Sequence, residues 1–254
     1  MDIKEARKVR RLALICVGVA VMAMGAGTVR ASSPKPPLER PGDTFETLHA
    51  RYDARAADDP DALHVLVQAA MLCREYEPNW KSEPFITSSF RVFGAWQDRF
   101  CGGVNRGNDY ARYKAIGKTT PWNSPVEKPL TLDEAVEVVL TSDSPTRLES
   151  AAYAIENGPT RWQLGTGLLR HTNIIPNLGQ LQAMAVRSIV CRYSGACDAG
   201  GMDTMWMCAR DRRCTPAITV FGLWATEHSR AEMAAVRSML QQLMQERERR
   251  GADR

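Results

Sequence analysis

The sequence predicts an all-α protein of antiparallel helical hairpins stapled by disulfide bonds, which follow an N-terminal signal or anchor segment. Apolar residues recur at helical spacing through most of the chain. No segment alternates apolar and polar residues over a useful length, as a half-buried strand would. Proline and glycine interrupt the helical stretches at short intervals, so we expect roughly nine short helices that pack in pairs.

The first 31 residues have the three-part layout of an export signal. A basic start precedes an uncharged run over residues 12–29, and the small residues Val29 and Ala31 occupy the third-last and last positions before the expected cleavage site. As a helix the run would span about 27 Å, just short of the hydrocarbon core of about 30 Å. Cleavage is therefore favoured over retention as an inner-membrane anchor. Either outcome places the rest of the chain outside the cytoplasm, in the periplasm or secreted.

The net charge of +4 belongs to this N-terminal segment. Residues 1–31 carry six of the 33 basic and two of the 29 acidic side chains, so the remaining residues carry equal numbers of each. A nucleic-acid-binding domain would need a basic surface. We therefore expect no nucleic-acid partner, and contact with a membrane only through residues 12–29 if they are retained.

Six cysteines follow the signal segment, in addition to Cys16 within it. An even number of cysteines in an exported chain is typical of a disulfide framework. The predicted disulfide residues are Cys73, Cys101, Cys191, Cys197, Cys208 and Cys214.

The order of the cysteines favours one pairing among several. Cys73 and Cys101 are near each other in the chain and are expected to pair. Residues 191–197 and 208–214 repeat a C-x5-C unit, which favours a bond within each unit. The alternative joins the first cysteines of the two units and, separately, the second cysteines. A structural zinc site would also use clustered cysteines, but zinc-binding pairs prefer shorter spacing and a reducing compartment, so we predict no metal ligand.

Proline-rich stretches divide the chain. Residues 32–42 hold four prolines and are predicted to form an extended tether. Residues 117–130 form a second break. This break separates an N-terminal helical subdomain over residues 43–116 from a C-terminal helical subdomain over residues 131–250, which contains the cysteine pairs.

Capping residues place the first helices of the N-terminal subdomain. Asp43 is predicted to cap a helix over residues 45–57. Asp59 and Pro60 supply a cap and a preset first turn for a helix over residues 60–76.

A third helix ends at Gly102 and Gly103 and carries aromatic residues at helical spacing. We expect this aromatic stripe to pack in the core rather than to line a ligand groove. A fourth, short helix is expected over residues 108–116. The aromatic stripe consists of Phe90, Phe93, Trp96 and Phe100.

The same signals predict six helices in residues 131–250. Capping boxes begin at Thr131 and Ser229, each followed three residues later by a glutamate. The first two helices of this half are close enough in sequence to form a hairpin. The last helix is expected to run to about Arg250, with a charged end that frays. The expected starts lie near Thr131, Pro145, Pro176, Gly201, Pro216 and Ser229.

The sequence contains no set of side chains with catalytic spacing, so no catalytic residue is assigned, and no cofactor is predicted. None of the four histidines forms a metal-binding pair at helical spacing. His64, on a partly buried helix, is predicted to be a hydrogen-bonded framework residue. A cell-wall glycosidase would need a glutamate in an apolar pocket. Glu156 is the best candidate for that role among carboxylates that are expected to be solvated.

Trp122 lies within the proline-rich break, where no predicted helix buries it. An exposed tryptophan in a loop is a common contact point for a partner or a glycan, so Trp122 is the candidate contact residue. The alternative is that Trp122 folds back over the joint between the two halves.

The export signal, the short helical pairs and the C-x5-C units in residues 191–214 resemble a group of uncharacterised exported, cysteine-bearing helical proteins of Gram-negative bacteria. Some of these are similar to Sel1-type helical repeats. Cys73 and Cys101 add to the resemblance, whereas the small and aromatic positions of a Sel1 repeat are not present. The resemblance implies a helical, disulfide-bonded architecture and supplies no catalytic residue.

These observations favour a non-enzymatic exported protein. It would be a cell-envelope scaffold or a helical module that binds a periplasmic or envelope protein, because helical hairpins form grooves that suit peptides and helices. Two alternatives stay open: a hydrolase of cell-envelope polymer, and an inhibitor or immunity-type protein.

Overall fold

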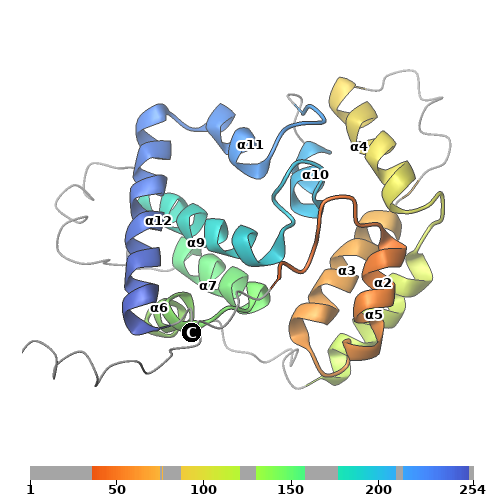
Figure 1. The fold of residues 1–254 in the computed structure, drawn as a ribbon, viewed down its shortest axis with the longest axis horizontal. Helices are drawn as coiled ribbons and strands as arrows, with labels where there is room; N and C mark the ends of the chain where they lie inside the picture. The colour runs from red at the N-terminus through yellow and green to blue at the C-terminus, as the bar shows by residue number, and fades with distance from the viewer. Residues whose placement is uncertain are drawn as a thin grey trace, which may run out of the picture. The chain divides into compact units, whose positions relative to one another are not determined.

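Helices form the fold in every part of the chain that the structure describes. The computed structural model describes residues 36–74, 76, 87–120, 130–157, 177–209 and 214–251, all within one unit of the chain. These residues contain ten α-helices, one short 3₁₀ helix and no strand (Figure 1). The all-α prediction is confirmed.

The N-terminal part of the described chain is built around one long helix. Its elements are α2 (Phe45–Tyr52), the 3₁₀ helix η1 (Asp53–Arg55), α3 (Pro60–Arg74), α4 (Ser88–Phe100) and α5 (Gly107–Thr119). Helix α3 packs against both α2 and α5 (Figure 1). The helix predicted over residues 45–57 is therefore split into α2 and η1, and the one predicted over residues 108–116 extends further at its C-terminal end.

The start of α3 follows the prediction, whereas α2 is capped by a different residue. The Asp59 carboxylate accepts two backbone N–H groups of the first turn of α3, at 3.0 and 3.2 Å. Thr44, not Asp43, is the N-cap of α2, since its hydroxyl accepts the N–H of Thr47. Asp43 instead forms an ion pair with Arg51 at 2.7 Å. The Asp43 carboxylate thus binds a guanidinium that α2 carries in its last turn.

The aromatic stripe of α4 lies mostly in the core, as predicted. Phe93, Trp96 and Phe100 are buried, and only Phe90 reaches 36% exposure. The Trp96 and Phe100 rings stack with their centroids 4.5 Å apart. The Trp96 indole also donates a hydrogen bond to the Gly200 carbonyl at 2.6 Å. This bond holds α4 to the cysteine-rich segment, residues 191–214, and α4 also packs against α10.

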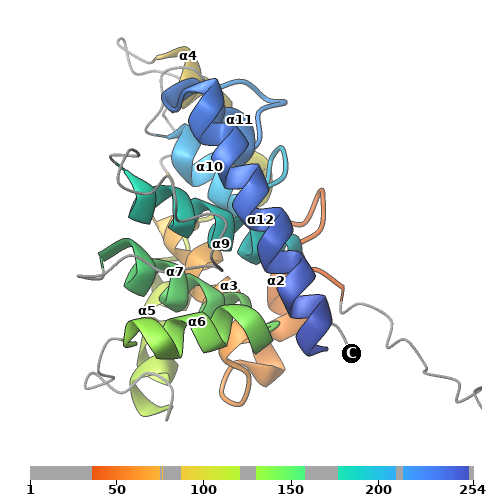
Figure 2. The same ribbon diagram turned by 90° about the vertical axis from the view of Figure 1, so that its left-hand side faces the viewer.

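Six α-helices form the C-terminal part of the described chain. They are α6 (Leu132–Thr141), α7 (Pro145–Asn157), α9 (Leu178–Ser194), α10 (Met202–Cys208), α11 (Val220–Glu227) and α12 (Arg230–Arg250). The short link over residues 142–144 makes a hairpin of α6 and α7, and α9 packs against both α7 and α12 (Figure 2). Buried side chains of α6, α7, α9 and α12, together with two from α11, form a second hydrophobic cluster. The buried side chains of α10 belong instead to the cluster around α3.

Both predicted capping boxes are present, and one predicted helix start is displaced. Thr131 and Ser229 each exchange hydrogen bonds with the glutamate three residues later. The helix predicted near Pro216 instead begins at Val220. The reason is that the Thr219 hydroxyl accepts a backbone N–H of the first turn and caps the helix there.

The prediction that the charged end of α12 frays is wrong. Arg247 is fully buried. Its guanidinium donates hydrogen bonds to the Val139 carbonyl and, at 3.0 Å, to the Tyr193 hydroxyl. Arg250 pairs with Glu137 of α6 at 3.0 Å. Because a buried guanidinium needs acceptors of this kind, the last turns of α12 are held against α6 and α9.

The structure confirms three disulfide bonds in the favoured pairing. Their Cα atoms lie 5.1 to 5.5 Å apart, within the usual range. The first bond joins the end of α3 to the residue after α4, and the other two close short loops after α9 and α10. Bonds of this kind persist in oxidising compartments, so they are compatible with a location outside the cytoplasm. The pairs are Cys73–Cys101, Cys191–Cys197 and Cys208–Cys214.

The cysteine-rich segment contributes side chains to both hydrophobic clusters. Met202 and Cys208 pack in the cluster around α3. Cys197 packs in the cluster around α9. The segment between α9 and α11 therefore lies where the two clusters meet.

Several predictions fall on residues outside the described ranges. The signal or anchor segment, residues 1–31, is among them, as is Trp122. In the ranges that are described, every helix is too short or too polar to span a membrane. The subdomain boundaries stay a prediction. Leu38 and Glu39, within the predicted tether, are buried.

Candidate functional site

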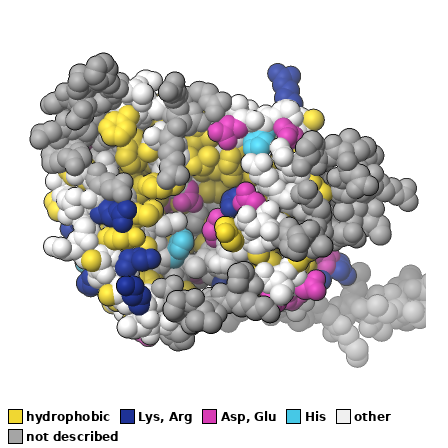
Figure 3. Space-filling view, turned by 180° about the vertical axis from the view of Figure 1, so that it is seen from behind, with side chains coloured by type: hydrophobic (Ala, Val, Ile, Leu, Met, Phe, Trp, Pro, Cys, Tyr) yellow, Lys and Arg dark blue, Asp and Glu magenta, His cyan; other side chains and the backbone are white. Residues whose placement is uncertain are grey.

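A cavity of about 380 Å³ is lined by side chains from both hydrophobic clusters. Helices α3, α7, α9, α10 and α11 contribute to its walls, together with the segment before α2. Its apolar lining includes Met202, Trp206, Met207 and Trp224. Figure 3 shows a face of the molecule on which hydrophobic side chains mix with acidic, basic and histidine side chains, the same mixture that lines the cavity. Such a combination of apolar walls and a few polar groups is typical of small-molecule sites.

Five titratable side chains line this cavity, and each comes from a different element of the chain. One precedes α2, and the others lie on α3, α7, α9 and α10. They are Glu39, His64, Glu149, Arg187 and Asp203.

Backbone hydrogen bonds between the segment before α2 and the end of α9 place Glu39 at the cavity. The N–H groups of Leu38 and Glu39 donate hydrogen bonds to the carbonyls of Tyr193 and Ser194 at 3.1 and 2.7 Å. Gly195 follows with a φ of +76°, and a Cβ at this position would lie 2.1 Å from the Glu39 carbonyl oxygen. Only glycine combines that conformation with such a close approach. The glycine that ends α9 therefore also makes room for the segment that carries Glu39.

The Glu39 carboxylate is bound at the start of α10. The Met202 N–H donates to both carboxylate oxygens, at 3.1 and 3.2 Å. Burial raises the pKa of Glu39 to about 8; the Met202 hydrogen bond opposes this rise, and the negative charges of Asp203, Asp43 and Asp198 add to it. At neutral pH the Glu39 carboxyl is therefore mostly protonated.

Asp203 lies in the first turn of α10. Burial, and after it the negative charge of Glu149, raise the pKa of Asp203 to about 6. The Asp203 Oδ2 atom lies 3.9 Å from the disulfide sulfur of Cys197, which has no hydrogen to donate. No other side chain or backbone group of the described residues donates a hydrogen bond to this carboxylate. Asp203 is thus a carboxylate beside the cavity without a donor.

Arg187 is bound between two glutamates of α7. Its guanidinium lies 3.0 Å from Glu149 and 2.9 Å from Glu156. Burial lowers the pKa of Arg187, but the two glutamates raise it above its ordinary value. A general acid of a glycosidase sits in an apolar pocket that keeps its proton in place. Glu156 is instead held by a guanidinium, so the geometry does not favour it as a catalytic acid.

His64 lines the cavity from α3. Burial lowers the pKa of His64, although Asp61 and Glu149 act in the opposite direction. The hydrogen bond predicted for this imidazole is not found among the described residues. A neutral imidazole therefore faces the cavity at neutral pH.

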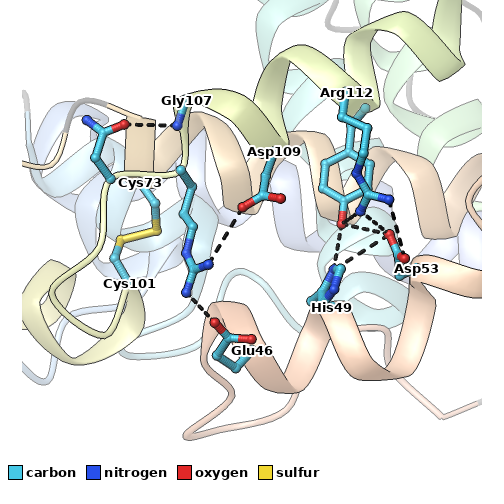
Figure 4. A network of polar contacts seen from close by, with 11 residues as sticks. Glu46, His49, Asp53, Cys73, Cys101, Gly107, Asp109 and Arg112 are labelled. Atoms are coloured by element: carbon cyan, nitrogen blue, oxygen red, sulfur yellow. Dashed lines mark hydrogen bonds and ion pairs between the residues drawn. A yellow bond between two sulfur atoms is a disulfide. The ribbon is translucent and has the colours of Figure 1, made fainter.

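A second cluster of polar side chains ties α2 and η1 to α5 (Figure 4). His49 Nδ1 lies 2.7 Å from the Tyr113 hydroxyl, which donates a hydrogen bond to Asp53 at 2.9 Å, and Arg112 also binds Asp53. Burial, followed by the bond to Asp53, raises the pKa of Tyr113. Each group in this cluster is bound by another member. The cluster is therefore a link between helices rather than a candidate site.

The sequence indicates the disulfide cysteines but contains no pattern that predicts the cavity. Trp122 lies outside the described residues, so its contact role stays a prediction. Glu39 lies in the predicted tether, where the apolar neighbour Leu38 is the one local sign of burial. Asp203 occupies the first turn of a helix, where acidic residues are common for reasons of the helix dipole alone. In the described ranges no cluster of His, Cys, Asp and Glu side chains could hold a metal ion.

The chain matches no protein-family model, and neither the curated proteins nor the solved structures include one that is similar to it. The resemblance of residues 191–214 to exported cysteine-bearing helical proteins stays a prediction. Function is therefore inferred from the disulfides and the cavity.

Proposed function

We propose that this protein is an exported, non-enzymatic binding module of the cell envelope, located in the periplasm or secreted. The cavity between the two hydrophobic clusters carries this proposal, because it is a preformed concave site with apolar walls and a few polar groups. The three disulfides support the compartment, since such bonds persist where the surroundings are oxidising. An envelope protein is the expected partner.

The contacts of the cavity's polar groups favour binding over turnover. Arg187 is engaged by Glu149 at 3.0 Å, and the Glu39 carboxylate is engaged by the Met202 N–H. Side chains that are fixed in this way can orient a bound molecule. A glycosidase instead needs an acid that is directed at the scissile bond and a second carboxylate beside it.

The environment of Glu39 supports hydrolysis of envelope polymer as a second candidate function. A carboxyl group with a pKa of about 8 holds a proton at neutral pH, and Asp203 lines the same cavity. An acid in an apolar pocket together with a second carboxylate is the pair that glycosidases use. Glu39 thus replaces Glu156 as the residue to test.

A zymogram and a crosslinking experiment, both with the exported protein and its disulfides intact, separate the two candidates. We expect no clearing of envelope polymer, and reproducible crosslinks to one envelope protein. The matched control is Asp58→Asn, because Asp58 is exposed and lies outside the cavity. A clearing zone that Glu39→Gln abolishes and Asp58→Asn preserves would replace binding by hydrolysis.

A further inference from the structure

The apolar walls of the cavity suit a ligand with an aromatic or short aliphatic body. Trp206, Met207 and Trp224 all line it, and its volume of about 380 Å³ is within the range of small-molecule sites. The faces of tryptophan rings also attract cations, because the ring quadrupole is negative there.

The charged groups of the cavity leave negative charge without a partner. The Asp203 carboxylate has no hydrogen-bond donor in the described part of the chain. Arg187 cannot supply one, because Glu149 and Glu156 already hold its guanidinium at 3.0 and 2.9 Å. His64, whose pKa burial lowers, is neutral at neutral pH. The cavity therefore lacks one cation for the carboxylates that face it.

We propose that the cavity binds a small organic ammonium ion with an apolar body, whose nitrogen pairs with Asp203 and whose body lies against Trp206 and Trp224. An ammonium group supplies the charged donor that this carboxylate lacks. An anion would be repelled by the negative charge of Asp203, and a neutral apolar molecule would leave Asp203 unpaired. This inference rests on the proposed binding function and adds a small-molecule ligand to the envelope protein that is its expected partner.

Three probes of equal size test the charge preference. Phenethylammonium, 2-phenylethanol and phenylacetate share a phenyl ring and a short linker but carry a positive charge, no charge and a negative charge. Titrations with the exported, disulfide-intact protein at pH 7.5 should show that phenethylammonium binds roughly tenfold more tightly than the alcohol. Phenylacetate should bind more weakly than both. Equal affinities, no binding by any probe, or a preference for phenylacetate would overturn the inference.

Substitution of Asp203 tests whether this carboxylate causes the preference for the ammonium probe. Asp203→Asn keeps the shape of the side chain and removes its charge, so it should weaken phenethylammonium binding by roughly tenfold and leave 2-phenylethanol unchanged. Asp58→Asn makes the same chemical change at an exposed position outside the cavity and should match the original protein. A loss that is the same for the ammonium and the alcohol would mean that Asp203 acts only on the fold.

Proton release gives a second test that needs no variant. A bound cation favours the ionised forms of Asp203 and Glu39 over their protonated forms. Calorimetric titration at pH 6.5 in two buffers of different ionisation enthalpy should therefore show that protons leave the protein when phenethylammonium binds. Binding without proton release would contradict the proposed position of the ammonium.

The outcomes distinguish this inference from the proposed function. Crosslinks to an envelope partner, combined with no preference among the probes, would leave the binding function standing and remove the ammonium ligand. Clearing of polymer that depends on Glu39 would remove the binding function itself.

Discussion

The Met202 N–H donates hydrogen bonds to both oxygens of the Glu39 carboxylate, at 3.1 and 3.2 Å, although the two residues are 163 positions apart in the chain. This contact holds the segment before α2 against the start of α10, at the edge of the cavity. Because burial raises the pKa of Glu39 to about 8, the folded protein holds a proton at neutral pH that the unfolded chain releases.

Stability should therefore depend on pH through Glu39. Between the ordinary pKa of 4.5 and the folded value of about 8, the folded state binds more protons than the unfolded state, so the free energy of unfolding falls as pH rises. The pKa of Asp203 is also raised, to about 6, so Asp203 likewise makes the free energy of unfolding fall as pH rises. Glu39→Gln removes the Glu39 contribution. As pH rises from 5 to 8, the free energy of unfolding of the variant should therefore increase by roughly 3 kcal/mol relative to that of the original protein. Urea denaturation of both proteins at several pH values measures this difference, and parallel pH profiles would show that Glu39 titrates normally.

The disulfide that closes the longest loop should contribute most to stability. Cys73 and Cys101 are 28 positions apart, whereas Cys208 and Cys214 are 6 positions apart. Loop-closure entropy predicts a loss of about 3.5 kcal/mol for replacing the first pair by alanine and about 2 kcal/mol for the second. All four side chains are buried, so the two double variants are matched. Denaturant midpoints compare them, and a larger loss from the short loop would contradict the entropic argument.

Arg247 should contribute far more to the free energy of unfolding than its position in the last turns of α12 suggests. Its guanidinium is fully buried and caps the end of α6 through the Val139 carbonyl, whereas Arg249 is 74% exposed. Arg247→Ala removes the donor that binds the buried Val139 carbonyl and should lower the free energy of unfolding by about 2 to 3 kcal/mol. Arg249→Ala, the matched control, should change it by less than about 0.5 kcal/mol. Equal effects of the two substitutions would mean that the end of α12 is frayed after all.

The features that the sequence predicted depend on a few adjacent residues. Asp59 starts α3, and Thr131 and Ser229 open capping boxes. Disulfides within C-x5-C units are equally local. Each of these signals acts through hydrogen bonds or bonds that span no more than six positions, so a linear pattern contains them.

The candidate site was not predictable from the sequence, because its contacts join residues that are far apart in the chain. Glu39 meets α10 only because its backbone pairs with Tyr193 and Ser194 at the end of α9. Arg247 is buried because α12 crosses α6, more than a hundred positions earlier in the chain. The cavity is lined by residues of five helices, of the segment before α2 and of the loop between α9 and α10. Contacts of this range follow from the packing of whole helices and leave no local pattern.

The oxidation state of the cysteines in the cell tests the central claim, that this is an exported protein held together by disulfides. Cells that make the full chain are quenched in denaturant with an alkylating reagent, and the protein is then weighed with and without prior reduction. We predict that none of the six cysteines between Cys73 and Cys214 is alkylated before reduction and that all six are alkylated after it. Alkylation of two or more of them without reductant would contradict the account.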